Sequence, residues 1–250
     1  MGCLSRARAS GHRLDDETSR ASKATKIIAA LAKTLGRDWT GRTCLDIGCS
    51  SGLITQHLAS RFRYTLGVEY DAAVKRAAKL STYSMAFARA DALRLPVRDS
   101  TVDVVVCAQV YEHVANAEIL FSEIWRVLVD GGVCFLSGPN KLYPVELHYR
   151  LPLIHWLPVS WAGACLRVLG RGKRYDMRSL TPRSLRRRLA GFQIQDLTVS
   201  ILRHRQAYAA TEEFGRLAWV SRLSDWLQPA LVAFVPNVSW VLKKPVQVGA

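Results

Sequence analysis

Residues 102–107 (Val-Asp-Val-Val-Val-Cys) form an almost unbroken apolar run of strand-forming residues. Such a run is typical of a strand buried on both faces of a parallel sheet, because a strand with one wet face alternates polar and apolar residues. Further strand-like runs at 44–47, 64–69, 85–90 and 133–137 alternate with helix-like segments. This alternation predicts an α/β fold with a doubly wound, mostly parallel sheet.

The segments between these strands carry helix signals. Apolar residues at helical spacing and capping residues predict helices at 21–35, 53–58, 71–80 with Asp71 as the cap, 117–128 and 181–189. Asp130-Gly131-Gly132 is expected to end the helix that precedes the strand at 133–137. Two further strands are expected at 192–199 and 239–242, on either side of a helical insertion at 203–236.

The positive charge of the chain is unevenly distributed. The formal net charge is +15, of which residues 1–42 carry +5, residues 43–140 carry −1 and residues 141–250 carry +11. Such asymmetry suggests that the flanks meet something anionic, such as a phosphorylated substrate, lipid head groups or nucleic acid. A solvated basic surface explains the same distribution equally well.

The six cysteines show neither a Cys-x-x-Cys pair nor a histidine at zinc-site spacing, and three of them lie in strand-like runs. Cysteine in such runs usually acts as a small buried hydrophobic residue. Residues 1–42 also lack the apolar stretch of a cleavable signal peptide. We therefore expect a cytoplasmic protein without a metal site; a location peripheral to the membrane is the alternative.

Residues 45–52 (Leu-Asp-Ile-Gly-Cys-Ser-Ser-Gly) lie directly between a predicted strand and a predicted helix. Ligands of open α/β sheets bind at the carboxyl ends of the strands, where small residues let the backbone approach closely. The segment lacks the three glycines of a dinucleotide loop and the Gly-Lys-Ser/Thr of a phosphate loop. Asp46 suits a cationic ligand better than a pyrophosphate.

Two acidic residues follow at later strand ends. Glu69 ends the next strand, about twenty residues downstream, where an acidic side chain can accept hydrogen bonds from both ribose hydroxyls. Asp91 closes the third strand and could accept a hydrogen bond from an adenine amino group. The three features together predict a nucleoside-containing ligand.

In order and in register, these features resemble the class I S-adenosylmethionine-dependent methyltransferases, and most of all the group with quinone-biosynthesis and other small-molecule enzymes. The likeness covers roughly residues 40–140. Residues 107–114 (Cys-Ala-Gln-Val-Tyr-Glu-His-Val) are similar to the family's Leu-Glu-His-Val stretch, with Tyr111 in place of leucine. The resemblance implies S-adenosylmethionine as the cofactor, held by Asp46, Gly48, Cys49, Ser50, Gly52, Glu69, Tyr70, Asp91, Ala92 and Gln109.

The same resemblance implies a seven-stranded sheet with one antiparallel edge strand, for which residues 192–199 and 239–242 are suitable. We expect a mobile basic leader at 1–20 and one domain at 21–250. Within that domain, residues 40–140 would bind the donor. Residues 141–250 would form an acceptor lobe with a helical insertion and the closing strands.

Methyl transfer from a sulfonium depends mainly on alignment of the acceptor, the methyl group and sulfur. An oxygen acceptor often also needs a base, and a histidine has a suitable intrinsic pKa. His113, after the fourth strand, and His148, after the fifth, are the candidates. His113 could equally serve to hold its loop in place.

The apolar region around Trp156 and Trp161 lies beside a basic cluster of Arg171, Lys173, Arg174, Arg178, Arg183 and Arg186–Arg188. The pair of features fits a small-molecule, lipid-linked or glycan-linked acceptor, methylated on oxygen or carbon, and peripheral association with an anionic membrane. A helical lid packed on the sheet would explain the tryptophans without a membrane.

Two other functions remain open at this point. Methylation of RNA would use the same positive charge, but no RNA-binding motif with interleaved aromatic residues is present, and nucleic acid is the less favoured partner. A non-catalytic binding module with this fold is also conceivable. The intact Asp46, Gly48, Gly52, Glu69 and Asp91 argue against that alternative, and the sequence does not indicate an oligomeric state.

Overall fold

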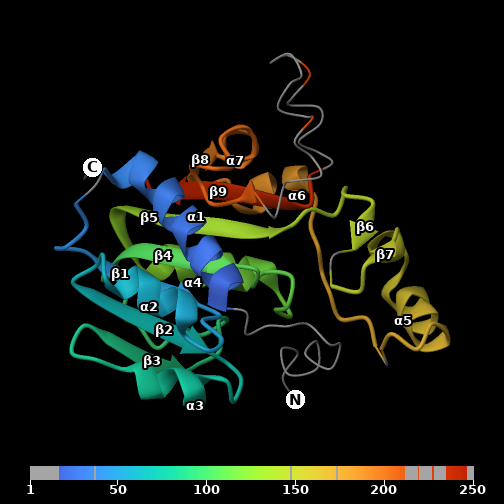
Figure 1. Cartoon of the computed structure of the whole chain (residues 1–250), viewed down its shortest axis with the longest axis horizontal. Helices are drawn as coiled ribbons and strands as arrows, with labels where there is room; N and C mark the ends of the chain where they lie inside the picture. Colours follow the sequence, from blue (N-terminus) through green and yellow to red (C-terminus); the bar gives the residue numbers. More distant parts are fainter. Residues whose placement is uncertain are drawn as a thin grey trace.

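The computed structural model describes residues 17–36, 38–146, 148–172, 174–211, 219, 227 and 235–246 (Figure 1). It contains a seven-stranded sheet with the strand order β3-β2-β1-β4-β5-β9-β8. The strands are β1 (Thr43–Ile47), β2 (Tyr64–Glu69), β3 (Met85–Arg89), β4 (Val102–Ala108), β5 (Leu128–Pro139), β8 (Gln193–Asp196) and β9 (Asn237–Lys243).

The direction of the strands confirms the predicted sheet. Neighbouring strands among β1 to β5 pair in parallel, whereas β9 pairs antiparallel with both β5 and β8. The antiparallel strand therefore lies one position in from the edge. The chain runs outward from β1 to β3 and then returns to β4 on the other side of β1. This reversal is the topological switch point, at which open α/β sheets form their ligand crevice.

Helices cover both faces of the sheet (Figure 1). On one face α1 (Glu17–Leu35), α2 (Leu53–Ala59) and α7 (Thr198–Arg203) contribute to a core that includes Val104 and Val106 of β4. On the other face α4 (Ala117–Val127) and α6 (Pro182–Arg188) pack on Val105 and Cys107 of the same strand. Successive residues of a strand point to opposite faces, so the apolar run at 102–107 supplies both cores.

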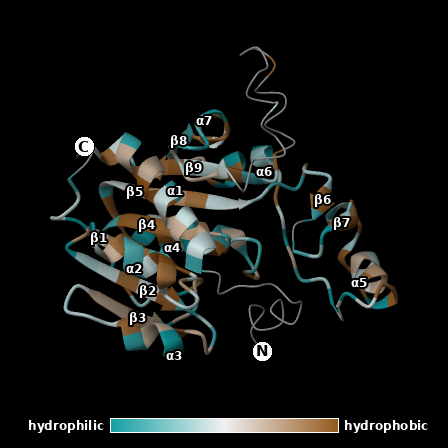
Figure 2. Ribbon diagram, viewed as in Figure 1, coloured by the Kyte–Doolittle hydropathy of each residue, from teal (hydrophilic) through white to brown (hydrophobic). Residues whose placement is uncertain are grey.

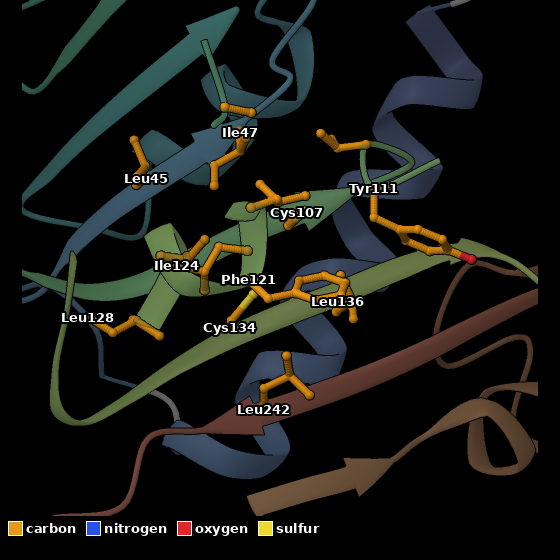
Figure 3. Packing of buried hydrophobic residues seen from close by; sticks show 14 of the residues in the cluster. Leu45, Ile47, Cys107, Tyr111, Phe121, Ile124, Leu128, Cys134, Leu136 and Leu242 are labelled. Atoms are coloured by element: carbon orange, nitrogen blue, oxygen red, sulfur yellow. The ribbon is translucent and has the colours of Figure 1, made fainter. Parts of the chain in front are cut away.

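Figure 3 shows the second of these cores, in which Phe121 and Ile124 of α4 lie against Cys134 and Leu136 of β5. Asn116 begins α4 by accepting a hydrogen bond from the backbone N–H of Glu118. The fully buried side chains of this core fix α4, and with it the loop that precedes α4 at the end of β4.

The predicted boundary between α4 and β5 is wrong. The helix ends at Val127 and β5 begins at once at Leu128, so Gly131 and Gly132 lie inside the strand. The pairing with β4 shifts register between Val102 and Val104, which accommodates the extra residues as an irregularity of the strand. Gly131 has a φ of +76°, a conformation that glycine adopts without strain.

Four other predicted boundaries also differ. The helix at 71–80 is reduced to α3 (Val74–Ala77) and the 3₁₀ turn η3 (Ala78–Leu80), with Ala73 and not Asp71 at the cap position. The strand at 192–199 ends at Asp196, because its carboxylate accepts from the N–H of Thr198 and α7 begins there. The first helix begins at Glu17, inside the predicted leader. Residues 204–209 form turns, and most of the predicted insertion at 212–234 lies outside the described residues, as do residues 1–16.

The segment after β5 forms a small lobe, here defined as the described residues of 145–178. It contains the short hairpin strands β6 (Val145–Glu146) and β7 (Leu151–Pro152), the 3₁₀ turn η4 (Ile154–Trp156) and α5 (Val159–Val168). The lobe extends away from the sheet (Figure 1), and its small core consists of Ile154, Ala162, Leu166, Tyr175 and Met177. None of the helices in the described part of the chain is long and apolar enough to cross a membrane.

Candidate active site

The loop between β1 and α2 is built around two glycines in the left-handed region. Gly48 has a φ of +74° and Gly52 a φ of +83°. A Cβ atom on Gly48 would lie 2.7 Å from Cγ2 of Val110, and one on Gly52 would lie 2.8 Å from the ring of Phe87. The backbone N–H of Gly48 donates to the carbonyl of Val68. Backbone conformation and close packing therefore both require glycine at these positions, as the motif predicted.

Glu69 closes this loop onto the end of β2. Its carboxylate accepts hydrogen bonds from the backbone N–H of Ser50 at 2.9 Å and from that of Asp71 at 3.2 Å. Glu69 is buried, and Ser50 itself has a φ of 52°. The sequence did not predict this contact with the loop. A carboxylate has about four acceptor positions, so it can also bind hydroxyl groups while it holds the loop.

Asp46 lies buried at the end of β1, where the Oγ1 of Thr55 donates to its Oδ2 at 2.6 Å. Burial raises the pKa of Asp46 to about 7, and the negative charge of Glu69 adds to the increase. A positively charged ligand at this position would stabilise the ionised carboxylate. The residues present therefore fit a cationic ligand.

Cys49 is buried in the same loop, and its backbone N–H donates to the carbonyl of Val68. Burial raises the pKa of the Cys49 thiol above its ordinary value, and the charges of Asp46 and Glu69 act in the same direction. The thiol is therefore a neutral, small packing group and not a nucleophile.

The remaining predicted donor residues occupy the next strand ends. Tyr70 follows β2, and its carbonyl accepts from Nε of Arg89. Asp91 follows β3, is exposed, and accepts from the N–H of Leu93 within its own turn. Ala92 is buried in the core of the α4 face. The structure places these three residues at the expected edge of the sheet, and their contact with the adenine stays a prediction.

Gln109 stands at the end of β4 with a φ of 59°. Its backbone N–H donates to the carbonyl of Ser137, and its Nε2 donates to Oδ1 of Asn237 at 3.3 Å. These partners lie on β5 and β9. Gln109 therefore links the end of β4 to β5 and β9.

The structure brings the two predicted histidines together, although they are 35 positions apart in the sequence. The ring centroids of His113 and His148 are 5.4 Å apart, and the rings are perpendicular. His148 Nδ1 lies 3.0 Å from Oε1 of Glu146, whose other oxygen accepts from the N–H of Tyr149. Burial alone would lower the pKa of His148, but the bond to Glu146 and the nearby negative charges outweigh it and raise the pKa above its ordinary value.

Glu112 lies beside this pair and is fully buried. Burial raises its pKa to about 7, and neither carboxylate oxygen has a hydrogen-bond partner within the described part of the chain. Glu112, His113 and His148 each offer a ligand atom, and these atoms lie within 4.8 Å of one another, so the group could hold a metal ion. From the sequence no metal site is expected. Glu112 and Glu146 are not among the predicted site residues, because only the neighbouring histidines were candidates for a base.

Comparison with known proteins shows what this part of the chain is similar to. Residues 45–136 match the family model described as a methyltransferase domain. A probable S-adenosylmethionine-dependent methyltransferase of Mycolicibacterium smegmatis is 34% identical over 41% of the chain and 40% of its own length. A ubiquinone biosynthesis O-methyltransferase of Psychrobacter arcticus is 28% identical over 66% of the chain and 64% of its own length. The chain thus matches less than two thirds of the length of these relatives.

A similar fold is found in the [4+2]-cyclase SpnF, with a TM-score of 0.57 and 19% identity over 90% of the chain and 82% of that protein. Because SpnF is named as a cyclase, this likeness concerns the fold and does not define the reaction. The family model covers the chain from within β1 to within β5, and this region carries the glycine loop, Glu69 and Asp91. Over residues 45–136 the chain therefore resembles a methyltransferase domain in both sequence and fold.

Proposed function

We propose that this chain binds S-adenosylmethionine at the ends of β1 and β2 and methylates a small-molecule or lipid-linked acceptor beside His113 and His148. The observation that carries the proposal is the closed loop at 48–52. Glu69 holds that loop by its backbone, and the desolvated carboxylate of Asp46 faces the same strand end. A methyl donor with a cationic centre and ribose hydroxyls would meet both groups there.

S-adenosylmethionine supplies a methyl group on a positively charged sulfur, which leaves with the bonding electron pair when an acceptor atom attacks the methyl carbon. Asp46 would favour the positive charge of this donor. Glu69 would accept hydrogen bonds from the ribose, with Tyr70, Asp91 and Ala92 beside the base. The loop contributes mainly by holding the donor in one position, since alignment is the main requirement of such a transfer.

An acceptor hydroxyl must lose its proton, and we infer that His148 would take it. Its Nδ1 is engaged with Glu146, so the ring is held in one orientation and Nε2 is the atom that would receive the proton. Glu146 would then stabilise the imidazolium that forms. The similarity to ubiquinone biosynthesis O-methyltransferases supports transfer to oxygen, with carbon as the other candidate.

Binding of the donor is tested first, by calorimetric titration of the chain with S-adenosylmethionine and S-adenosylhomocysteine. The Glu69→Ala variant should bind more weakly by about 1–3 kcal/mol, the scale for removing a partner of buried polar groups. Glu69→Gln is the matched control, because it retains an acceptor oxygen and most of the side-chain volume. A folded wild type that binds neither compound would overturn the proposal and leave a non-catalytic module with this fold.

The acceptor is tested with labelled donor, using lipid extract and phenolic small molecules in parallel with bulk RNA. Label should enter the lipid or phenolic fraction. The His148→Gln variant should lose about 10²–10⁴-fold in turnover, the usual contribution of a positioned acid–base group. Its donor affinity should remain unchanged. Label that enters RNA instead would replace the proposed acceptor class by the RNA alternative.

A further inference from the structure

The lobe exposes an unusual concentration of large apolar side chains. Between residues 153 and 169 seven of them are exposed, with exposed fractions of 67% for Trp161 and 49% for Trp156; the others are Leu153, Leu157, Val159, Val168 and Leu169. Large apolar residues that are exposed elsewhere in the described chain, such as Tyr83, are scattered over several elements. A concentrated apolar surface of this kind usually marks an interaction site.

These side chains are not an unfinished core. The opposite side of α5 already packs inward, with Ala162 and Leu166 buried against Tyr175 and Met177. The ring of Trp156 is half exposed while its Nε1 donates to the carbonyl of Lys141 at 2.6 Å. The polar edge of the indole is therefore fixed to the protein, and its apolar face points outward. Figure 2 shows the mixed hydropathy of α5 at the end of the molecule that is remote from the sheet.

The charge around this surface is positive. The described arginines of the lobe, all exposed, are Arg150, Arg167, Arg171, Arg174 and Arg178. Its two acidic residues are less accessible: Glu146 is buried and bonded to His148, and Asp176 is about half buried. Arg171 donates to the carbonyl of Tyr149, which fixes one guanidinium at the base of α5. The exposed charge therefore complements an anionic surface.

We propose that the lobe docks on an anionic lipid bilayer, with Trp156, Trp161 and Val159 in the interface and the arginines against the head groups. Tryptophan favours the level of the head groups, and basic residues add about fivefold each in affinity near an anionic surface. The helix α5 has ten residues, or about 15 Å, half the thickness of the hydrocarbon core. It would therefore lie in the plane of the interface.

Docking there would bring the candidate active site close to the bilayer. Glu146 belongs to β6 of the lobe and holds His148, so the acceptor side of the crevice is part of the docking unit. A lipid-linked acceptor could then reach His148 without leaving the interface. This consequence rests on the proposed function, whereas docking itself can be measured without any activity.

Docking is tested by co-sedimentation of the full chain with phosphatidylcholine vesicles, with and without an equal amount of phosphatidylglycerol, at low salt. The wild type should bind the anionic vesicles at least tenfold more tightly than the neutral ones. The double variant Trp156→Ser, Trp161→Ser should lose at least tenfold in affinity for the anionic vesicles. Tyr83→Ser removes an exposed aromatic residue outside the lobe and serves as the matched control, with unchanged binding.

Titration of the same preparations with S-adenosylmethionine distinguishes a failure of the docking proposal from a failure of the proposed function. A double tryptophan variant that still binds S-adenosylmethionine is folded, so its loss of vesicle binding supports docking by the lobe. The docking proposal would be overturned if the wild type does not bind anionic vesicles. It would also be overturned if the double variant binds them as tightly as the wild type. A double variant that changes only the oligomeric state would show that the surface meets a second copy of the chain and would overturn it as well.

Discussion

The sheet and the lobe differ in how far their apolar side chains are buried. In the sheet, Val104, Val105, Val106 and Cys107 of β4 are all completely buried between two layers of helices. In the lobe, α5 buries Ala162, Gly163 and Leu166 but exposes Val159, Trp161 and Val168. The difference suggests that most of the folding free energy comes from the sheet, whereas the lobe has an apolar surface that is available for contacts.

The largest expected effect concerns a leucine in the sheet. Leu136 lies fully buried on β5, and Leu136→Ala should lower the free energy of unfolding by about 2–5 kcal/mol, the usual cost of such a cavity. Leu166→Ala in the lobe is the matched comparison, since Leu166 is also fully buried but within a much smaller cluster. It should leave the affinity for S-adenosylmethionine within about twofold of the wild type, because the donor loop belongs to the sheet.

Urea denaturation and donor titration measure both quantities. A loss of donor binding in the Leu166→Ala variant would show that the lobe and the sheet are one energetic unit. A cost below about 1 kcal/mol for Leu136→Ala would contradict the role of the sheet as the main source of stability, because complete burial of a leucine predicts more.

Alanine substitutions at Gly52 and Gly170 distinguish the effect of backbone strain from the effect of close packing. Gly52→Ala places a Cβ within 3.0 Å of Phe87 and Ala77 at a φ of +83°, and donor affinity should fall by about 1–3 kcal/mol, the cost of a strained backbone. Gly170, after α5, has a φ of +63° with open space around it. Gly170→Ala should introduce backbone strain without a steric clash, and the affinity for the donor measured by calorimetry should stay unchanged. Equal losses of donor binding in the two variants would contradict a local effect at the loop.

Elements whose conformation follows from the local residue pattern could be predicted from the sequence. The apolar run at 102–107 predicted β4, and Thr181-Pro182 predicted the start of α6, where Thr181 accepts from the N–H of Ser184. The start of β5 was predicted at residue 133 and not at Leu128, because the register shift against β4 allows Asp130 and both glycines to be part of the strand. That shift depends on pairing between strands, which local composition does not contain.

In the site, too, local features could be predicted and contacts between distant segments could not. The loop at 48–52 could be predicted because it requires only small residues and a left-handed backbone conformation. The link from Glu69 to Ser50 and the buried carboxylates of Glu112 and Glu146 depend on distances between separate loops. Glu112 directly precedes His113, and Glu146 lies two residues before His148, so neighbouring acids beside each histidine were the available signal.

The affinity for the donor should depend on pH through Asp46. Its carboxyl has a pKa of about 7 in the folded protein, above the ordinary value near 3.9 for the unfolded chain. A raised carboxyl pKa means that the stability of the unliganded protein falls as the pH rises from about 4 to 7. Binding of a cationic donor needs the ionised form, so affinity should instead rise by up to about tenfold between pH 6 and pH 8.

Calorimetric titration at several pH values measures this slope. Asp46→Asn should bind weakly at every pH and show a flat profile. Glu112→Gln is the matched control, because Glu112 has a similarly raised pKa but lies on the acceptor side, and it should keep the wild-type slope. If Glu112→Gln flattens the profile and Asp46→Asn does not, the cationic donor centre is not beside Asp46.

The smallest expected effect on stability belongs to the most exposed tryptophan of the lobe. Trp161→Ala should change the free energy of unfolding by no more than about 0.5 kcal/mol, the usual range for a surface position without specific contacts. Thermal and urea denaturation of the full chain measure this change directly. A loss above about 1 kcal/mol would show that the ring supports the fold of the lobe, as a lid residue would. A negligible loss, beside the large cost of Leu136→Ala, would mean that folding does not account for this tryptophan, because the chain keeps an exposed indole that its own stability does not need.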